Sequence, residues 1–241
     1  MTDLLWPAYD GPDDLAAIEA VPLADRSLPA TTYDIVTRAA ATWGDRPATS
    51  CLTDAAHWQA PSMRTFTGLA EAVHRTANTF AALGIGRRDA VAIISVNCES
   101  MLWAILGAQA AGIAAPINPG LSAGHVTKLA RLARAKVLVV SGPELDSRIW
   151  QLGRRVAADT GATALLALRP TSATGHGPDL EPVAGVIVGY LDDLAAAAPP
   201  GHLQCPPPVA ADIASYLHTG ERPACPSWRR TPTATRWRTR G

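Results

Sequence analysis

Two residues near the carboxyl end of the chain, Thr219 and Gly220, are the candidates for a functional site. They follow residues 213–217, a short apolar run with the composition of a β-strand. A strand that runs into threonine, serine or glycine opens many phosphate-binding loops, because backbone N–H groups and hydroxyls can then surround an anion. We interpret Thr219 and Gly220 as the start of a phosphate-binding loop, with an ordinary strand-ending turn as the alternative.

The composition of the chain changes directly after Gly220. Residues 221–241 contain six arginines, one acidic residue and two tryptophans, Trp228 and Trp237. The whole chain has 21 basic and 21 acidic residues, which leaves 15 basic and 20 acidic ones for residues 1–220. An acidic body of net charge −5 therefore precedes a tail of net charge +5. The tail has neither the apolar period of a helix nor that of a strand.

Short motifs occur in a fixed order along residues 33–220. They are R-T-F-T-G-L at 64–69, A-N at 77–78, L-G-I-G-R-R-D-A-V at 83–91, N-C-E at 97–99, L-G at 106–107, A-G at 111–112 and P-I-N-P at 116–119. Together with H-T-G at 218–220, the set resembles the N-terminal half of the adenylation domain of AMP-forming acyl-CoA synthetases. One position departs from the family's pattern, because Arg88 stands where the family has the glycine of its G-D pair.

The phosphate loop of that family reads T-G-G-T-T-G-x-P-K, and only its first residues occur in this chain. If one G is restored after the Gly220 codon, the genetic code permits G-T-T-G-L-P-K-L-A, and further on H-T-H-x-N-E-V. We therefore interpret residues 221–241 as the product of a frameshift, and we expect this arginine-rich tail to be disordered and not to pack on the body.

The resemblance implies a chemistry. Enzymes of this family join a carboxylic or fatty acid to coenzyme A through an acyl-adenylate, so ATP, Mg²⁺ and CoA are the implied cofactors and small molecules the substrates. Thr219 and Gly220 match the start of the ATP phosphate loop. In the family the rest of that loop, the adenine pocket, the Mg²⁺ carboxylate and the lysine of the C-terminal domain follow it. We therefore expect no catalytic or metal-binding residue in this chain, and no activity of its own.

The pattern predicts three regions: an N-terminal extension (1–30), a partial AMP-binding domain (31–220) and the tail (221–241). Strand and helix patterns alternate through the second region with short connections, which is typical of a parallel α/β sheet. The expected fold class is an α/β parallel sheet with flanking helices, an incomplete form of the N-terminal subdomain of an AMP-binding adenylation domain.

Apolar runs and apolar residues at helical spacing place the individual elements. The expected strands are 91–95, 113–117, 137–140, 164–168 and 213–217, with a hairpin at 48–53 and 63–67. The expected helices are 31–41, 68–83, 100–111, 122–135, 148–160 and 189–198. We expect the first three strands to be adjacent and parallel, with residues 102–111 and 125–135 packed on the faces of the sheet. Residues 170–210 are rich in proline and glycine and predict a surface connection around the last helix.

Other residues capable of chemistry give weaker patterns. The four cysteines and the histidines at 57, 74, 125 and 218 lack metal-ligand spacing, so we interpret these histidines as surface or capping residues. Asp13-Asp14 and Asp192-Asp193 are interpreted as solvated charges at helix starts, and Asn118-Pro119-Gly120 as a turn. The N-terminus does not resemble a signal peptide, and the apolar run at 102–117 is too short to span a bilayer. We expect a cytoplasmic protein without a transmembrane segment.

Two alternatives to the ligase interpretation remain. The chain could be a non-catalytic interaction or dimerisation module that self-associates through uncovered apolar surface. It could also bind nucleic acid through the arginines and tryptophans of the tail, since arginine charge and aromatic stacking combine in that way. The acidic body argues against the second alternative, so we expect no nucleic-acid partner.

Overall fold

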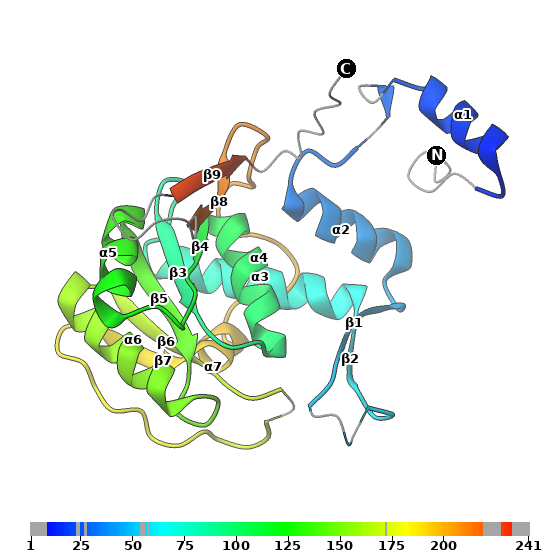
Figure 1. Cartoon of the computed structure of the whole chain (residues 1–241). Helices are drawn as coiled ribbons and strands as arrows, with labels where there is room; N and C mark the ends of the chain where they lie inside the picture. Colours follow the sequence, from blue (N-terminus) through cyan, green and yellow to red (C-terminus); the bar gives the residue numbers. More distant parts are fainter. Residues whose placement is uncertain are drawn as a thin grey trace.

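The centre of the molecule is a parallel β-sheet (Figure 1). The computed structural model describes residues 9–22, 25–26, 28–53, 56, 58–171, 173–218 and 228–232. In this part of the chain seven strands form the sheet in the order β7-β6-β5-β3-β4-β8-β9. In chain order they are β3 (Ala90–Ile94), β4 (Ile113–Pro116), β5 (Ala135–Ser141), β6 (Ala164–Leu168), β7 (Ile187–Tyr190), β8 (Ile213–His218) and β9 (Trp228–Pro232). Neighbouring strands are parallel except for β8 and β9, so the predicted α/β class is confirmed.

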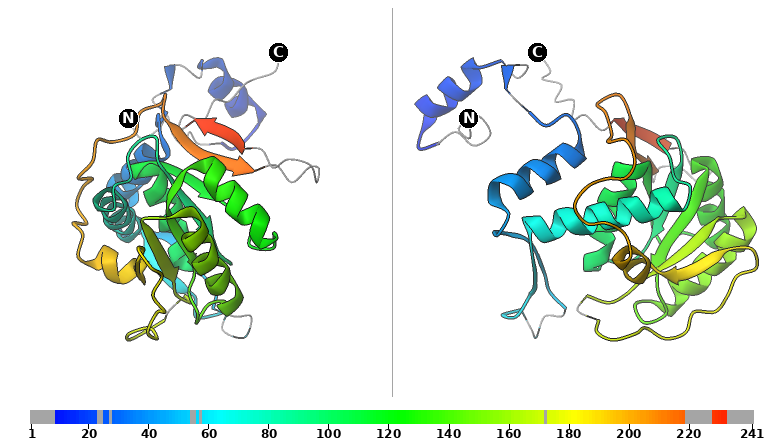
Figure 2. Two further views of the ribbon diagram at one scale, coloured as in Figure 1. Left: turned by 90° about the vertical axis from the view of Figure 1, so that its left-hand side faces the viewer. Right: turned by 180° about the vertical axis from the view of Figure 1, so that it is seen from behind.

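Helices cover both faces of this sheet (Figures 1 and 2). On one face lie α3 (Phe66–Ala82), α4 (Glu99–Ala111) and α7 (Leu191–Ala196), and on the other α5 (Ala123–Ala133) and α6 (Ser147–Thr160). Successive side chains of a strand point to opposite faces. Accordingly, Val91 and Ile93 of β3 join the α3–α4 core, whereas Ala92 and Ile94 join the α5–α6 core.

The strong sequence patterns correspond to the most buried elements. All residues of β3 and of β6 are buried, which explains why both are unbroken apolar runs. The predicted strands β4, β3 and β5 are adjacent and parallel, and α4 and α5 cover opposite faces, as expected. Helix α3 begins two residues earlier than the pattern predicts, because the Thr65 hydroxyl accepts from the N–H of Gly68 at 3.1 Å and caps the helix.

Strand β7 was not expected from the sequence. It is four residues long, contains Gly189, and lies within the segment that prolines and glycines mark as a connection. Its pairing with β6 is what makes it a strand, since Leu165 lies opposite Val188 and Ala167 opposite Tyr190. A sequence pattern carries no signal for such a long-range pairing.

Of the elements before α3, α2 (Thr32–Trp43) and the hairpin of β1 (Pro47–Cys51) and β2 (Ser62–Thr65) pack against α3, whereas α1 (Pro12–Ala20) stands apart from the body. Helix α2 is capped by Thr31 and contributes Val36 to the α3–α4 core. Strands β1 and β2 form the predicted antiparallel hairpin. Helix α1 has no buried residue and lies away from the sheet in Figure 1.

Polar side chains of α3 hold the connection of residues 197–212, which leads from α7 to β8. Asn78 makes the central contacts: its amide nitrogen donates to the carbonyls of Pro199 (3.0 Å) and His202 (2.9 Å), and its oxygen accepts from the N–H of Gln204 (2.7 Å). Asn78 is only 3% exposed, so these bonds are shielded from water. The A-N motif at 77–78 therefore has a structural role.

We expect Asn78→Ala to lower the free energy of unfolding by about 2–3 kcal/mol, because it removes three hydrogen bonds made by a buried side chain to the connection. The matched control is Asn97→Ala, which removes an exposed asparagine from the loop after β3. Urea unfolding followed by circular dichroism measures both variants. Equal stability of Asn78→Ala and the parent would show that the connection is held by other contacts.

The structure describes part of the tail as a strand. Residues 228–232 form β9, which pairs antiparallel with β8, with Tyr216 opposite Arg230 and His218 opposite Trp228. For these five residues the expectation that the tail does not pack on the body is wrong. The physical reason is that ladder hydrogen bonds use the backbone, so a sequence without strand periodicity can still cover an exposed strand edge. Residues 219–227 and 233–241 lie outside the described residues.

None of the helices in the described part of the chain combines the length and the apolar character needed to cross a lipid bilayer.

Candidate functional site

The predicted phosphate site belongs at the carboxyl end of β8, beside β4. Thr219 and Gly220 directly follow β8, but both lie outside the described residues, so their role stays a prediction. The residues around them are described. The N–H of Asn118, in the turn after β4, donates to Nε2 of His218 at 3.2 Å. This bond places the β4–α5 turn at the end of β8.

The turn after β4 brings a helix N-terminus to the same edge. The side-chain oxygen of Asn118 accepts from the N–H of Gly120 at 2.8 Å, which confirms the predicted turn. Ser122 then caps α5 by accepting from the N–H of His125, and its hydroxyl contacts His125 Nδ1 at 2.9 Å. His125 is exposed, which agrees with its interpretation as a surface or capping residue. A helix N-terminus favours anions, so this edge of the sheet is electrostatically suited to phosphate.

The strand order changes direction between β3 and β5, because β4 lies on one side of this pair and β6 and β7 on the other. The crevice at the carboxyl ends of β3 and β5 is closed by two serines. Ser95 and Ser141 follow the apolar runs of these strands, and their hydroxyl oxygens are 2.8 Å apart. Ser141 Oγ also accepts from the N–H of Val96 at 3.1 Å and is fully buried. Crevices of this kind often hold ligands in open α/β sheets. Here both hydroxyls are used in internal hydrogen bonds, so the crevice is a structural junction, which sequence reasoning had not identified.

A polar cavity of about 530 Å³ lies between α3, α4 and α7. Arg64 pairs with Glu99 at 3.1 Å and lies over the Trp103 ring at 4.4 Å, which joins the motifs at 64–69 and 97–99. The Trp103 indole N–H donates to Asp192 at 3.1 Å. Asp192 is half-buried, and this burial raises the pKa of its carboxyl above the ordinary value despite the Trp103 bond and the Arg64 charge. The interpretation of Asp192 as a solvated helix-start charge is therefore wrong, whereas its neighbour Asp193 is exposed.

The raised pKa of Asp192 predicts a pH-dependent gain in stability for Asp192→Asn. Because the folded state holds the proton to a higher pH than the unfolded state, ionisation of Asp192 costs stability as pH rises through the raised pKa. Asparagine can still accept from Trp103 and carries no charge. We expect Asp192→Asn to melt above the parent at pH 7, with the difference vanishing below the ordinary aspartate pKa of about 4.

Thermal melts of Asp192→Asn and the parent at several pH values measure this difference. Asp193→Asn, at the exposed neighbouring position, controls for the loss of one negative charge. A stability difference that stays constant between pH 3 and pH 7 would contradict the assignment to Asp192.

The remaining candidate residues have structural roles. His74 is buried rather than on the surface, because its Nδ1 lies 2.6 Å from the Pro200 carbonyl and its Nε2 lies 3.0 Å from the Tyr33 hydroxyl. This corrects the interpretation of His74, and His57 lies outside the described residues. Burial raises the pKa of the Cys98 thiol, which disfavours a reactive thiolate. Among the residues that the structure describes, no group of three or more His, Cys, Asp and Glu could hold a metal ion.

Comparison with known proteins yields consistent similarities. The sequence profile of a family described as "AMP-binding enzyme" matches residues 36–220. A marinolic acid–CoA ligase from a Pseudoalteromonas species is 26% identical over 153 residues, which are 64% of this chain and 23% of that protein.

Solved structures show the same fold. A putative long-chain-fatty-acid CoA ligase from Rhodopseudomonas palustris superimposes with a TM-score of 0.61 and 22% identity, over 84% of this chain and 44% of that one. Mycobacterium smegmatis MbtA superimposes with a TM-score of 0.63 and 20% identity, over 96% of this chain and 39% of that one. The chain thus spans less than half the length of each of these three proteins.

Proposed function

The chain belongs to the AMP-binding enzyme family, and from this membership we propose that it is an N-terminal portion of an AMP-forming acyl-CoA ligase. The parent reaction joins a carboxylic or fatty acid to CoA, with conversion of ATP to AMP and pyrophosphate. The observation that carries the proposal is the family match over residues 36–220, which ends at the strand and turn where we place the phosphate loop. The CoA ligases among the similar proteins support the choice of reaction.

In this proposal Thr219 and Gly220 begin the loop that holds the phosphates of ATP. The structure supports their position through the neighbours of β8: the Asn118–His218 bond and the capped N-terminus of α5 lie at the same edge of the sheet. Backbone N–H groups at such an edge would bind and orient an anion without any proton transfer.

The described residues at this edge do not provide a ligand set for Mg²⁺. Asn118 brings an amide, Ser122 a hydroxyl and His218 an imidazole, whereas Mg²⁺ prefers carboxylates and water in octahedral geometry.

We further propose that residues 221–241 arise from a frameshift and that the 241-residue chain forms no acyl-adenylate. The family match stops at Gly220, the residue after which the charge of the sequence reverses, and this coincidence supports the proposal. The pairing of β9 with β8 is compatible with it, because strand pairing does not require the family's side chains. The alternatives, an interaction module and nucleic-acid binding by the tail, stay predictions.

The coding DNA downstream of the Gly220 codon tests the proposal. We expect the frame restored by one added base to encode G-T-T-G-L-P-K and to continue open over the length of a ligase. A restored frame without this loop sequence would contradict the frameshift interpretation. Downstream DNA with no ligase sequence in either frame would favour an interaction module.

A further inference from the structure

The amino edge of the sheet, opposite to the proposed phosphate loop, carries a second cavity. Three segments meet there, each just before a strand: Arg87 and Arg88 precede β3, Arg134 precedes β5, and Asp212 precedes β8. All four residues line a cavity of about 370 Å³. Ligands of parallel α/β sheets ordinarily bind at the carboxyl ends of the strands. The proposed ligase reaction therefore gives no reason for a cavity at this edge.

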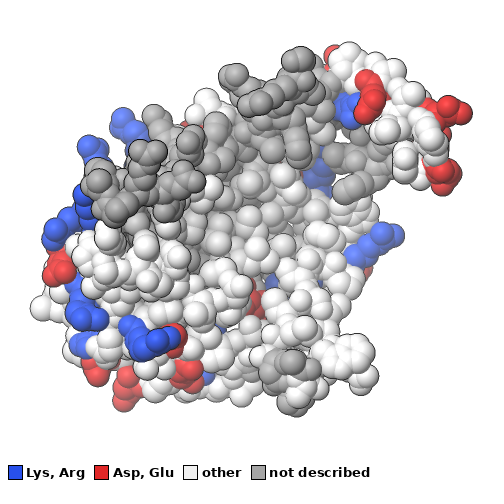
Figure 3. All heavy atoms as spheres, viewed as in Figure 1, with Lys and Arg blue, Asp and Glu red and all other residues white. Residues whose placement is uncertain are grey.

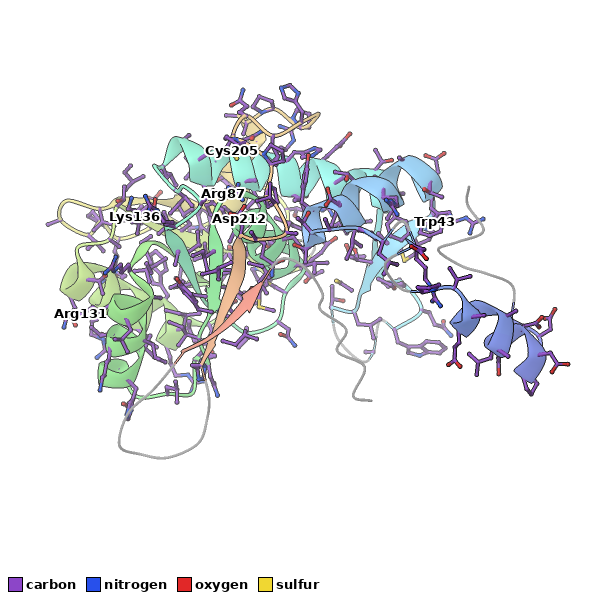
Figure 4. All side chains as sticks on the ribbon, turned by 90° about the horizontal axis from the view of Figure 1, so that it is seen from above. Trp43, Arg87, Arg131, Lys136, Cys205 and Asp212 are labelled. Carbon is purple, nitrogen blue, oxygen red and sulfur yellow. The ribbon has the colours of Figure 1, made fainter. Side chains whose placement is uncertain are left out.

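The cavity has an excess of positive charge. Its arginines are Arg87, Arg88 and Arg134, and the guanidinium groups of the latter two are at exposed positions, with no hydrogen bond or ion pair to any described residue. Of the two neighbouring acids, Asp89 pairs with Lys136 at 2.9 Å. Asp212 accepts from the N–H of Val209 at 2.9 Å and keeps its negative charge, so among the described residues three arginines face one unpaired carboxylate. Figure 4 shows Arg87, Lys136 and Asp212, from three separate segments, gathered at this end of the molecule.

The guanidinium of Arg87 supplies a fixed positive charge beside the cavity. Its Nη2 donates to the carbonyls of Ala110 and Pro206, which fixes the side chain in place. Its Nη1 is buried and has no hydrogen-bond partner among the described residues. Because Nη1 is covered by protein atoms, Arg87 acts on the cavity through its charge, and an anion there is attracted to that charge without a hydrogen bond to Nη1.

Two of the arginines stand where a glycine is typical. Arg134 ends α5 in the left-handed conformation, with φ of 54°, which glycine or asparagine usually adopts. Arg88 occupies the glycine position of the G-D turn noted above. Because a guanidinium binds two oxygens of a phosphate at once, a set of arginines favours phosphate over a simple halide. The walls beside them are apolar or aromatic, with Ile113, Leu132 and Tyr216.

We propose that this cavity binds a small phosphate-bearing molecule, with the phosphate held by Arg88 and Arg134 near the fixed charge of Arg87, and an apolar or aromatic body against Ile113, Leu132 and Tyr216. Its volume of about 370 Å³ lies within the usual range for small-molecule pockets, about 300–1,000 Å³. The site is separate from the proposed ATP loop, because the two lie at opposite ends of β8.

A second basic groove serves as the comparison. It lies on the outer surface of α5 and α6 and is lined by Lys128, Arg131 and Arg155, on the side of the molecule where Figure 3 shows many basic side chains. There Arg131 donates to the carbonyl of Asp159 at 2.6 Å, and the Asp159 side chain also lines the groove. None of the lining residues has a buried unpaired donor among the described residues. This groove therefore provides the control variant.

Titration calorimetry at constant ionic strength tests the proposal on the full chain, with phenyl phosphate and inorganic phosphate as probes. We expect saturable binding of both, tighter for phenyl phosphate because of the apolar walls. Arg88→Gln and Arg134→Asn should each weaken binding about tenfold, equivalent to about 1.4 kcal/mol. Asparagine tolerates the left-handed backbone at position 134, so this variant keeps the turn. Arg155→Gln should leave binding unchanged.

Several outcomes would overturn the proposal. Absence of saturable binding at millimolar probe would do so, and so would equal weakening by Arg155→Gln, which would indicate non-specific charge attraction. Equal affinity for the two probes would contradict the proposed contact between an apolar ligand body and the walls of the cavity. Thr219→Val distinguishes the cavity from the proposed ATP loop. Weaker probe binding in this variant would place the phosphate at the carboxyl end of β8 and contradict the proposal. Circular dichroism checks the fold of each variant. If Arg134→Asn does not fold, the binding result for Arg88→Gln decides the test.

Discussion

Restoring one base after the Gly220 codon is expected to give an active ligase, whereas the 241-residue chain is expected to show no ATP–pyrophosphate exchange. The physical reason is that adenylation depends on preorganised donors around the phosphates. Loss of a single such donor typically lowers turnover by a factor of about 10²–10³. Residues 221–227 read E-R-P-A-C-P-S, which does not match the loop sequence expected from the family, so we expect nearly all of these donors to be missing. Exchange assays with a panel of fatty and aromatic acids measure both proteins.

An insertion of three bases at the same position is the matched control. It lengthens the chain by one residue but keeps the frame of residues 221–241, so it should not produce exchange. Exchange by the 241-residue chain itself would show that the active site lies elsewhere. A stop codon soon after the restored loop would mean that the ligase assignment describes ancestry only.

Leu138→Asp is expected to abolish cooperative folding. Leu138 is fully buried in the α5–α6 core, in β5, opposite Ala92 of β3 and Leu165 of β6. An unpaired carboxylate there costs several kcal/mol, a large part of the roughly 5–15 kcal/mol by which domains are stable. We expect insoluble protein or the loss of a cooperative thermal transition.

The control for this variant is Leu132→Asp. Leu132 is 52% exposed on α5, so a carboxylate at this position stays hydrated and should change the melting temperature little. If Leu138→Asp melted at the temperature of the parent, the assignment of β5 to the centre of the sheet would be wrong.

The sequence by itself determined the parallel sheet, because its strands are buried on both faces. Residues that contact protein on every side are mostly apolar, so β3 and β6 read as unbroken apolar runs. The ordered motifs led to the family for a related reason. Asn78 holds the 197–212 connection, and Arg64 pairs with Glu99, so specific tertiary contacts of the fold constrain these motif residues.

Only the tertiary structure decided features that depend on pairing between distant segments. Strands β7 and β9 exist because β6 and β8 offer free backbone edges, and backbone hydrogen bonding leaves no pattern of side chains to detect. In the sequence Asp192 has the pattern of a solvated helix-start charge. In the structure the indole N–H of Trp103, 89 residues away, donates to its carboxylate. The cavity lined by Arg87, Arg88 and Arg134 also depends on segments that are distant in the sequence. Arg88 and Arg134 are far apart in the sequence and meet because strands β3, β5 and β8 begin at one edge of the sheet.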